Sequence, residues 1–282
     1  MTDRRSFLHA LGAAALASTV PSGLRGAQPS IASRRRLASV GIQLYTMRSE
    51  MASDFDGTLE RLAEIGYREV EFAGYFDRTP DRVRATLDRL GLTSPATHLG
   101  IEQVRDNLDA TIDSARTIGQ RWLVVPSLPG SMRSVEGYTQ VAGILNRAGE
   151  KAMAAGVGVG FHNHDVEFRP VDGRLPMDIL VTGTDPALVT FELDLYWISV
   201  AGHDPVTYLN SHPGRFSMVH VKDMDGSEQK RMVDPGEGTI DFPGIYAARE
   251  RAGIRHWFVE HDRPADAWTT ARTGFAYLDA LV

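Results

Sequence analysis

Residues 157–165 read Val-Gly-Val-Gly-Phe-His-Asn-His-Asp, an apolar run that ends in ionisable side chains. The same change from apolar to ionisable residues occurs within residues 188–197, 216–223 and 256–262. Polar and apolar residues alternate in each stretch, and this period of two predicts β-strands. Active groups of a parallel barrel gather at the carboxyl ends of its strands, so we expect these four stretches to build one site.

The rest of the chain alternates short β-rich segments with segments of helical spacing. Apolar residues recur at helical intervals within 55–65, 83–90 and 104–118, and a glycine commonly marks the end of such a segment. Eight strands alternating with helices predict an α/β fold, a (β/α)8 TIM barrel over residues 38–282. The alternative is an open doubly wound sheet, but no glycine-rich turn follows the first strand. The expected strands are 40–47, 69–73, 94–99, 121–125, 157–164, 188–196, 216–221 and 256–261.

The N-terminal region differs from the rest of the chain. Arg4 and Arg5 precede an uncharged apolar run over 11–20. This pattern resembles a twin-arginine export leader, which predicts a leader at 1–27, a linker at 28–37 and a periplasmic or secreted protein. The alternative is a short membrane anchor, but about ten apolar residues cannot cross a hydrocarbon core of ~30 Å, so we expect no stable membrane span.

Composition restricts the possible chemistry. The 282 residues contain no cysteine, so any metal ion must be held by nitrogen and oxygen ligands. The formal net charge is −6, and no run of Lys or Arg occurs after residue 36. A nucleic-acid surface needs clustered positive charge, so we expect a small-molecule partner and no nucleic acid. The sequence leaves a homo-oligomer open.

The four strand ends carry an unusual concentration of ionisable groups. Residues two apart share one face of a strand, and burying so many of these groups is costly unless a cation neutralises the carboxylates. Histidine and carboxylate ligands suit one divalent ion, Mn²⁺, Zn²⁺, Co²⁺ or Mg²⁺. A structural, hydrogen-bonded role is the alternative for any single one of them. The same-face pairs are His162 with His164, Glu192 with Asp194, His220 with Lys222, and Glu260 with Asp262.

The ordered set of motifs resembles the sugar phosphate isomerase/epimerase family of xylose-isomerase-like TIM barrels. The resemblance covers about residues 38 to 282. It rests on GFHNHDVEF at 160–168, FELDLYW at 191–197, VHVKD at 219–223, GEGTIDF at 236–242 and FVEHD at 258–262, together with GIQLYT at 41–46 and GYREVEF at 66–72.

The resemblance implies one divalent ion bound by groups from strands five to eight, commonly Glu, Asp, His and Glu. Asp194, His220 and Glu260 match the last three of these residues. On strand five this chain departs from the family pattern, because His162 stands where the family has Glu. We expect His162 as the fourth ligand, with His164 and Glu192 as substitutes.

The chemistry that the resemblance implies is proton transfer beside a sugar carbonyl, by way of an enediolate. The expected function is therefore a metal-dependent sugar isomerase or epimerase. Glu260 or His164 is the candidate base, and Lys222 is the candidate partner of the developing oxyanion. The residues expected to orient hydroxyls or stack on the ring are His98, Glu71, Glu167 and Trp197.

Other functions use the same metal site. A histidine on strand five breaks the symmetric pair of carboxylates that epimerases of this family use. The alternative is the β-elimination or hydrolysis of a 3-keto-glycoside, or the dehydration of a keto-cyclitol. The resemblance extends to such lyases, and the predicted export favours them because periplasmic sugars arrive as glycosides or oxidised derivatives. A non-catalytic sugar-binding module is a further alternative, but three of the four family ligands remain. An apurinic endonuclease would need a basic face for DNA, against which the net charge argues.

Overall fold

The computed structural model describes residue 37 and residues 39–281. The predicted leader at 1–27 and nearly all of the predicted linker lie outside the described residues, so both stay predictions. Among the described residues, none of the helices has the length and apolar character needed to cross a membrane.

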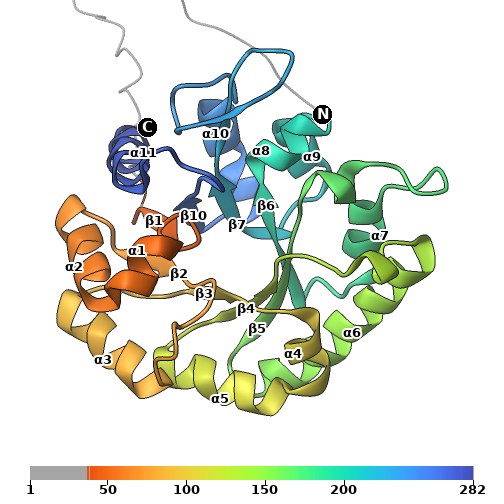
Figure 1. The fold of residues 1–282 in the computed structure, drawn as a ribbon. Helices are drawn as coiled ribbons and strands as arrows, with labels where there is room; N and C mark the ends of the chain where they lie inside the picture. Colours follow the sequence, from red (N-terminus) through yellow and green to blue (C-terminus); the bar gives the residue numbers. More distant parts are fainter. Residues whose placement is uncertain (1–36, 38, 282) are drawn as a thin grey trace, which may run out of the picture. The chain divides into compact units, whose positions relative to one another are not determined.

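Eight parallel strands form the barrel that the sequence predicted (Figure 1). Their order in the sheet is β2-β1-β10-β7-β6-β5-β4-β3. Each strand lies within the range expected from sequence: β1 Gly41–Gln43, β2 Glu69–Glu71, β3 Ala96–His98, β4 Trp122–Val125, β5 Gly158–His162, β6 Val189–Asp194, β7 Phe216–Val221 and β10 His256–Val259.

The barrel is nearly closed between β2 and β3. Isolated parallel bridges join Glu69 to Thr93 and Phe72 to Thr97, and the backbone amide of His98 donates to the carbonyl of Phe72 at 2.7 Å. Because closure brings β3 beside β2, His98 reaches the same interior as residues from the late strands.

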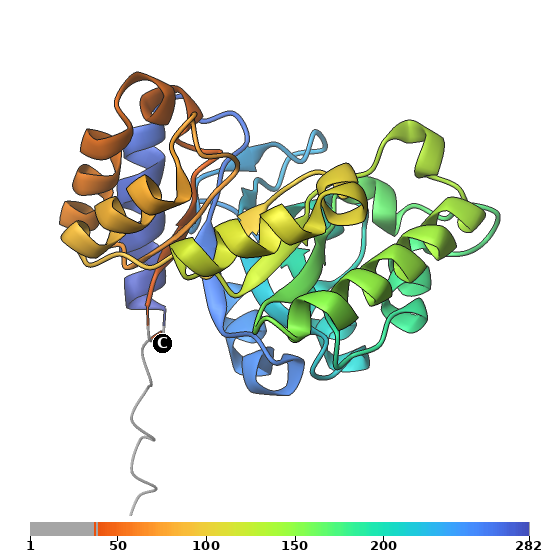
Figure 2. The same ribbon diagram turned by 90° about the horizontal axis from the view of Figure 1, so that it is seen from below.

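The helices surround the strands (Figure 1). The last of them, α11, lies beside α2 (Figure 2). Between these two helices the Arg61 guanidinium lies 3.9 Å from the centre of the Trp268 ring. The helices are α1 Arg48–Ser53, α2 Phe55–Ile65, α3 Pro80–Leu90, α4 Ile101–Asp106, α5 Leu108–Ile118, α6 Val135–Met153, α7 Pro176–Gly183, α8 Leu195–Val200, α9 Pro205–Ser211, α10 Phe242–Ala252 and α11 Ala267–Ala280, with 3₁₀ turns η1 Gly130–Met132 and η2 Asp165–Phe168.

Three local features differ from the sequence-based expectation. The sixth strand ends at Asp194 and not at Tyr196, because the Asp194 side chain caps helix α8. The helical stretch 104–118 is broken at Asn107, which ends α4 and begins α5. A short antiparallel hairpin of β8 (Asp223–Met224) and β9 (Met232–Val233) follows the seventh strand and was not predicted.

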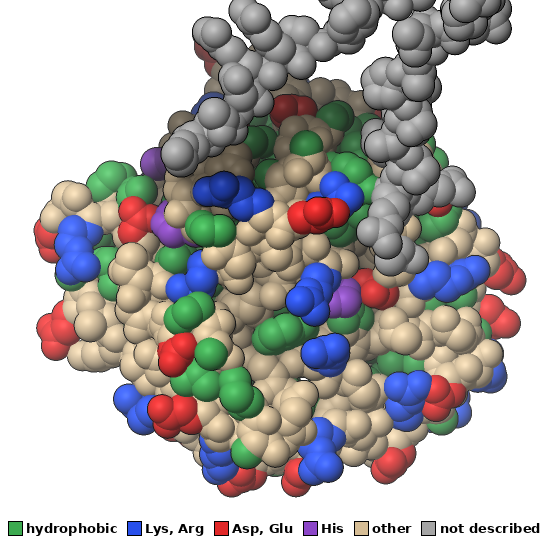
Figure 3. Space-filling view, turned by 180° about the vertical axis from the view of Figure 1, so that it is seen from behind, with side chains coloured by type: hydrophobic (Ala, Val, Ile, Leu, Met, Phe, Trp, Pro, Cys, Tyr) green, Lys and Arg blue, Asp and Glu red, His purple; other side chains and the backbone are tan. Residues whose placement is uncertain are grey.

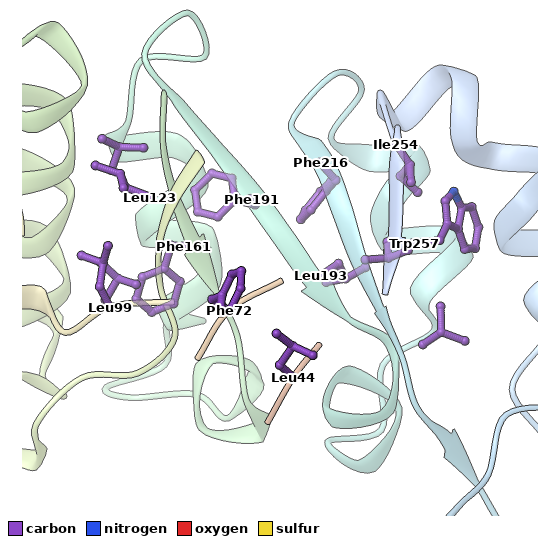
Figure 4. Packing of buried hydrophobic residues seen from close by; sticks show 14 of the residues in the cluster. Leu44, Phe72, Leu99, Leu123, Phe161, Phe191, Leu193, Phe216, Ile254 and Trp257 are labelled. Carbon is purple, nitrogen blue, oxygen red and sulfur yellow. The ribbon is translucent and has the colours of Figure 1, made fainter. Parts of the chain in front are cut away.

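Large apolar side chains fill the layer between the strands and the helices (Figure 4). Phe161, Phe191 and Phe216 are fully buried there. A second, smaller cluster consists of Ala96, Val124, Met218 and Phe258, all fully buried. Met218 and Phe258 precede His220 and Glu260 by two residues, so they point into the barrel below those side chains. This second cluster is the apolar floor of the site.

The outer surface carries charges of both signs. On the face seen from behind, Lys and Arg side chains are interspersed with Asp and Glu side chains (Figure 3). Charges of one sign form no continuous field on the part of this face that the described residues make up (Figure 3).

Candidate metal centre and cavity

A cavity of about 600 Å³ opens at the carboxyl ends of the strands. Loops after β1, β2 and β3 form one side of it, and groups from the later strands form the other. The residues that line it are Tyr45, Arg48, Ala73, Gly74, His98, Leu99, Gly100, Gln103, Pro126, His162, His164, Trp197, Lys222, Glu260, Asp262 and Arg263.

Asp194, His220 and Glu260 form the first of two groups with the geometry of a metal site, here called the upper group. Their ligand atoms lie within 4.8 Å of one another, and all three residues are buried. His220 Nδ1 lies 2.6 Å from Glu260 Oε2. Apart from ion-pair contacts with one another and with Lys222, neither these atoms nor Asp194 Oδ2 makes a hydrogen bond within the described part of the chain. Buried carboxylates and imidazoles that share a single ammonium keep lone pairs free, so this donor set fits a divalent cation.

Lys222 is buried beside the upper group. Its Nζ lies 2.8 Å from Asp194 Oδ2, 2.8 Å from Glu260 Oε2 and 2.6 Å from Asp262 Oδ1. Burial alone would lower the pKa of Lys222, but these three carboxylates raise it well above its usual value. The side chain is therefore a fixed ammonium on the cavity wall.

The two carboxylates of the upper group differ in proton affinity. Burial raises the pKa of Asp194 to about 6, against the opposing effect of Lys222. Burial also acts to raise the pKa of Glu260, but Lys222 and His220 outweigh it and hold that pKa well below the usual range. Glu260 is therefore the more firmly ionised of the two.

His98, His162, Glu192 and His220 form the second group, here called the deep group. Their ligand atoms also lie within 4.8 Å of one another. Glu192 Oε2 is at the centre, 2.7 Å from His98 Nε2, 3.2 Å from His162 Nδ1 and 3.0 Å from His220 Nε2. The strand register explains this contact, because His162 on β5 is paired directly with Glu192 on β6.

The predicted strand-five ligand, His162, belongs geometrically to the deep group. Its Nδ1 faces Glu192, whereas its Nε2 is 3.6 Å from Asp194 Oδ2. His162 therefore lies between the two groups, and the upper group contains three of the four residues predicted as ligands.

Glu71 supports His220 from below. Its Oε2 is 2.7 Å from His220 Nε2 and accepts a hydrogen bond of 2.8 Å from Gln43 Nε2. Glu71 is fully buried and does not line the cavity. The sequence placed Glu71 against substrate, but the structure places it against His220 of the upper group and off the cavity wall.

Glu167 also lies off the cavity wall. It is 1 % exposed, its Oε1 accepts a hydrogen bond from the Tyr138 hydroxyl at 3.0 Å, and its Oε2 accepts one from the backbone amide of His164 at 2.8 Å. Both oxygens of Glu167 are thus used by the protein. It was expected to contact substrate, but here it fixes the turn that carries His164.

His164 and Trp197 lie side by side on the cavity wall, with ring centroids 5.6 Å apart. Burial, helped by Lys222, lowers the pKa of His164 to about 4, so its imidazole is neutral at pH 7. Asp194 Oδ1 accepts hydrogen bonds from the amides of Tyr196 and Trp197 and so sets the direction of Trp197. The buried Trp197 Nε1 has no partner among the described residues and can donate to a ligand.

Sequence reasoning missed some contributors to the site. Asn163 is fully buried, and its Oδ1 accepts a hydrogen bond of 2.9 Å from the Asp194 amide, which fixes a predicted ligand. Tyr45 lies in the turn after β1 and Arg48 begins α1, and both line the cavity. Glu192 was considered only as a substitute ligand, although its spacing of two residues from Asp194 was visible in the sequence.

The arrangement defines a class of protein: a barrel with histidine and carboxylate donors and a fixed ammonium at its strand ends. Residues 59–281 match the family described as xylose isomerase-like TIM barrel, and the chain belongs to this family.

Relatives and solved structures agree with this assignment. The inosose dehydratase of Lacticaseibacillus casei is 23% identical over 269 residues, covering 81% of this chain and 90% of the relative. A sugar phosphate isomerase/epimerase structure from Parabacteroides distasonis superposes with a TM-score of 0.77 at 27% identity, covering 89% of this chain and 96% of the other. A zinc-bound IOLI protein has the same fold, with a TM-score of 0.68 at 15% identity and coverage of 85% and 96%.

Proposed function

We propose that this protein is a metal-dependent dehydratase that acts on a keto-cyclitol or a similar cyclic keto-sugar. The observation that carries the proposal is the different chemistry of two groups on the cavity wall. His164 is a neutral imidazole, and Lys222 is an ammonium fixed by carboxylates. An epimerase needs two similar groups to move a proton between two faces, whereas an elimination needs a base and a different acid or cation.

Similarity to inosose dehydratases supports this choice of reaction. These relatives match most of their own length and most of this chain. The strand-five histidine, His162, also favours dehydration over epimerisation, because it removes one carboxylate of the pair on which epimerisation of this type depends. Similarity to inosose dehydratases gives dehydration, the alternative expected from the sequence, more support than isomerisation.

The upper group would hold the ion through Asp194, His220 and Glu260. Three protein ligands leave positions open for a substrate, as is usual for catalytic ions. An ion bound there supplies Lewis acidity, which makes the carbon next to a coordinated carbonyl more acidic. Zinc in the IOLI structure supports a divalent ion for this fold but does not identify the metal here.

The protein's own groups would carry out the elimination. His164 takes the proton from the carbon beside the carbonyl, and the electron pair of the broken C–H bond delocalises into an enolate. Lys222 stabilises the negative oxygen. The enolate then re-forms the carbonyl and expels the β-hydroxyl, which leaves as water after it accepts a proton from the imidazolium of His164. Glu260 is the second candidate base, while His98 and Trp197 orient ring hydroxyls.

The proposal is tested by incubating the metal-loaded protein with an inosose. We expect loss of one water, seen by mass spectrometry, and the appearance of ultraviolet absorbance from the conjugated product. His164→Gln and Lys222→Met should each lower kcat by about 10²-fold or more, within the range for loss of an acid–base or oxyanion group. Turnover that survives in both variants would contradict the assigned roles. The same incubation with 3-keto-glycosides, read by release of the aglycone, tests the related elimination or hydrolysis.

Isomerisation or epimerisation of a ketose is the second candidate. The likeness to the Parabacteroides distasonis sugar phosphate isomerase/epimerase supports it. Incubation with free ketoses in deuterated water separates the two reactions. Solvent deuterium in an epimeric ketose, without loss of water from an inosose, would favour this second candidate over dehydration.

We also propose that residues 1–27 direct export. Arg4 and Arg5 before an uncharged apolar run support this proposal. Fractionation of cells that express the full chain should place the protein in the periplasm or medium, and replacing both arginines by lysine should retain it in the cytoplasm. Unchanged export in that variant would count against the twin-arginine route.

A further inference from the structure

The deep group has the donor atoms of a metal site of its own. His98, His162 and Glu192 come from β3, β5 and β6, whereas Glu260 of the upper group comes from the loop after β10. Glu192 Oε1 is buried in the deep group and makes no hydrogen bond or ion pair within the described part of the chain, whereas His162 Nδ1 lies 3.2 Å from Glu192 Oε2 and Glu71 Oε1 lies 3.5 Å from His98 Nε2. An unpaired carboxylate oxygen at this depth fits a bound cation better than it fits an empty interior.

The histidine nitrogens can be divided between two ions without conflict. A neutral imidazole has one nitrogen that accepts and one that donates. His220 can give its Nδ1 to an ion in the upper group while its Nε2–H donates to Glu71, 2.7 Å away. A carboxylate behind a metal-bound histidine is a common supporting arrangement. His98 Nε2 and His162 Nδ1 then remain for the deep group.

We propose that a second divalent cation binds in the deep group through His98 Nε2, His162 Nδ1 and a carboxylate oxygen of Glu192. The proposal rests on the proposed function for the neighbouring upper-group ion. The strand-five histidine, which departs from the family pattern, is thereby used by the deep ion and not by the upper one. His98 and His162 both line the cavity, so the deep ion is accessible to a ligand bound there.

The charge of the whole cluster agrees with two ions. The cluster contains five carboxylates and one ammonium, Lys222, which gives four net negative charges when its histidines are neutral. Two divalent ions would neutralise all four charges. Without metal, burial alone would lower the pKa of His220, but the carboxylates raise it well above its usual value, and a proton there compensates part of the charge. The carboxylates are those of Glu71, Glu192, Asp194, Glu260 and Asp262.

The test measures bound manganese in the purified full-length protein after loading with Mn²⁺ and removal of free metal. We expect two equivalents per chain. His98→Asn and Glu192→Gln should each retain one equivalent, and so should Asp194→Asn. The matched control is His256→Asn, because His256 pairs with Glu69 at 2.9 Å at the starts of the strands, away from both groups, and this variant should bind two equivalents.

A spectroscopic measurement tests proximity independently. Ions in paired sites lie about 3.5–4 Å apart, so two Mn²⁺ ions should give an exchange-coupled electron paramagnetic resonance signal that His98→Asn abolishes. His98 has a side-chain exposure of 10 % and is the milder variant if Glu192→Gln does not fold, which circular dichroism would reveal.

The outcomes separate this inference from the proposed function. A wild-type protein that binds one equivalent, retained in His98→Asn and lost in Asp194→Asn, would overturn the deep site and leave the upper ion intact. One equivalent that is lost in His98→Asn and retained in Asp194→Asn would support the deep site and overturn the proposed ligands of the upper ion. Two uncoupled equivalents that His98→Asn does not change would also reject the deep site.

Discussion

Replacing Lys222 by methionine removes the ammonium that joins three carboxylates, and it keeps most of the apolar stem. The Lys222 side chain is 2 % exposed and its Nζ lies 2.6 to 2.8 Å from oxygens of Asp194, Glu260 and Asp262. In the variant, Asp194 and Glu260 remain buried next to each other without this cation. We therefore expect Lys222→Met to destabilise the metal-free protein strongly.

The size of the effect follows from the burial of the carboxylates. Removing one partner of a buried ion pair costs about 3–5 kcal/mol, because the remaining charge is left uncompensated. For a domain of this size each kcal/mol shifts Tm by about 2–4 °C, so Tm should fall by about 6–20 °C. A divalent ion bound to the same carboxylates replaces part of the lost positive charge. The loss should therefore be smaller at saturating Mn²⁺, and added metal should stabilise the variant more than the wild type.

The assay is thermal unfolding followed by circular dichroism, with chelator and with Mn²⁺. Lys230→Met is the matched control, because Lys230 Nζ donates to the backbone carbonyl of Val200 at 2.9 Å and forms no ion pair among the described residues. This control should lose less stability and should show no difference in its response to metal. If Lys222→Met loses no more stability than Lys230→Met, or if Mn²⁺ stabilises both variants equally, the reasoning about the upper group is refuted.

Four further predictions concern other parts of the molecule. Asp194→Asn should lower Mn²⁺ affinity at least tenfold by titration calorimetry, and an unchanged affinity would contradict its role as a ligand. Trp197→Phe removes the free indole N–H and should raise KM more than it lowers kcat, with metal content unchanged. Phe258→Ala opens the apolar floor and should cost about 3–5 kcal/mol in chemical denaturation. The Thr86 hydroxyl donates a hydrogen bond of 2.7 Å to Asp56 and lowers the pKa of this carboxyl. The ionised Asp56 therefore contributes its full stabilisation above pH 3.8, and the contribution is lost as the pH falls through the lowered pKa. The difference in unfolding free energy between wild type and Asp56→Asn should accordingly narrow below pH 3.8.

The sequence predicted the strands well because their signals are local. Alternation of apolar and polar residues identifies a strand from its own few residues, and glycine marks the end of the preceding helix. Gly91, Gly119 and Gly253 each end a helix in the left-handed conformation in which glycine is favoured. The hairpin of β8 and β9 was missed because each of its strands has only two residues, too few for a period to appear.

The partners of each site residue depend on the register between strands, which the sequence does not contain. The period of two correctly predicts that His162 points into the barrel. The period does not show whether the His162 ring contacts Glu192 or Asp194, which lie two residues apart on β6. The pairing of β5 with β6 places His162 level with Glu192, and that of β6 with β7 places Asp194 level with His220. Register therefore decides which histidine belongs to which group.

The two oxygens of Asp194 show how the fold and the site are built from the same residue. Oδ1 caps α8, accepting from the amides of Tyr196 and Trp197, and this capping ends the strand two residues earlier than the sequence suggested. Oδ2 forms an ion pair with Lys222 Nζ at 2.8 Å. Because the capping bonds hold the carboxylate plane, Oδ2 can point only toward the upper group. The missed strand end and the fixed orientation of the proposed ligand are consequently one feature, the change from strand to helix at Asp194.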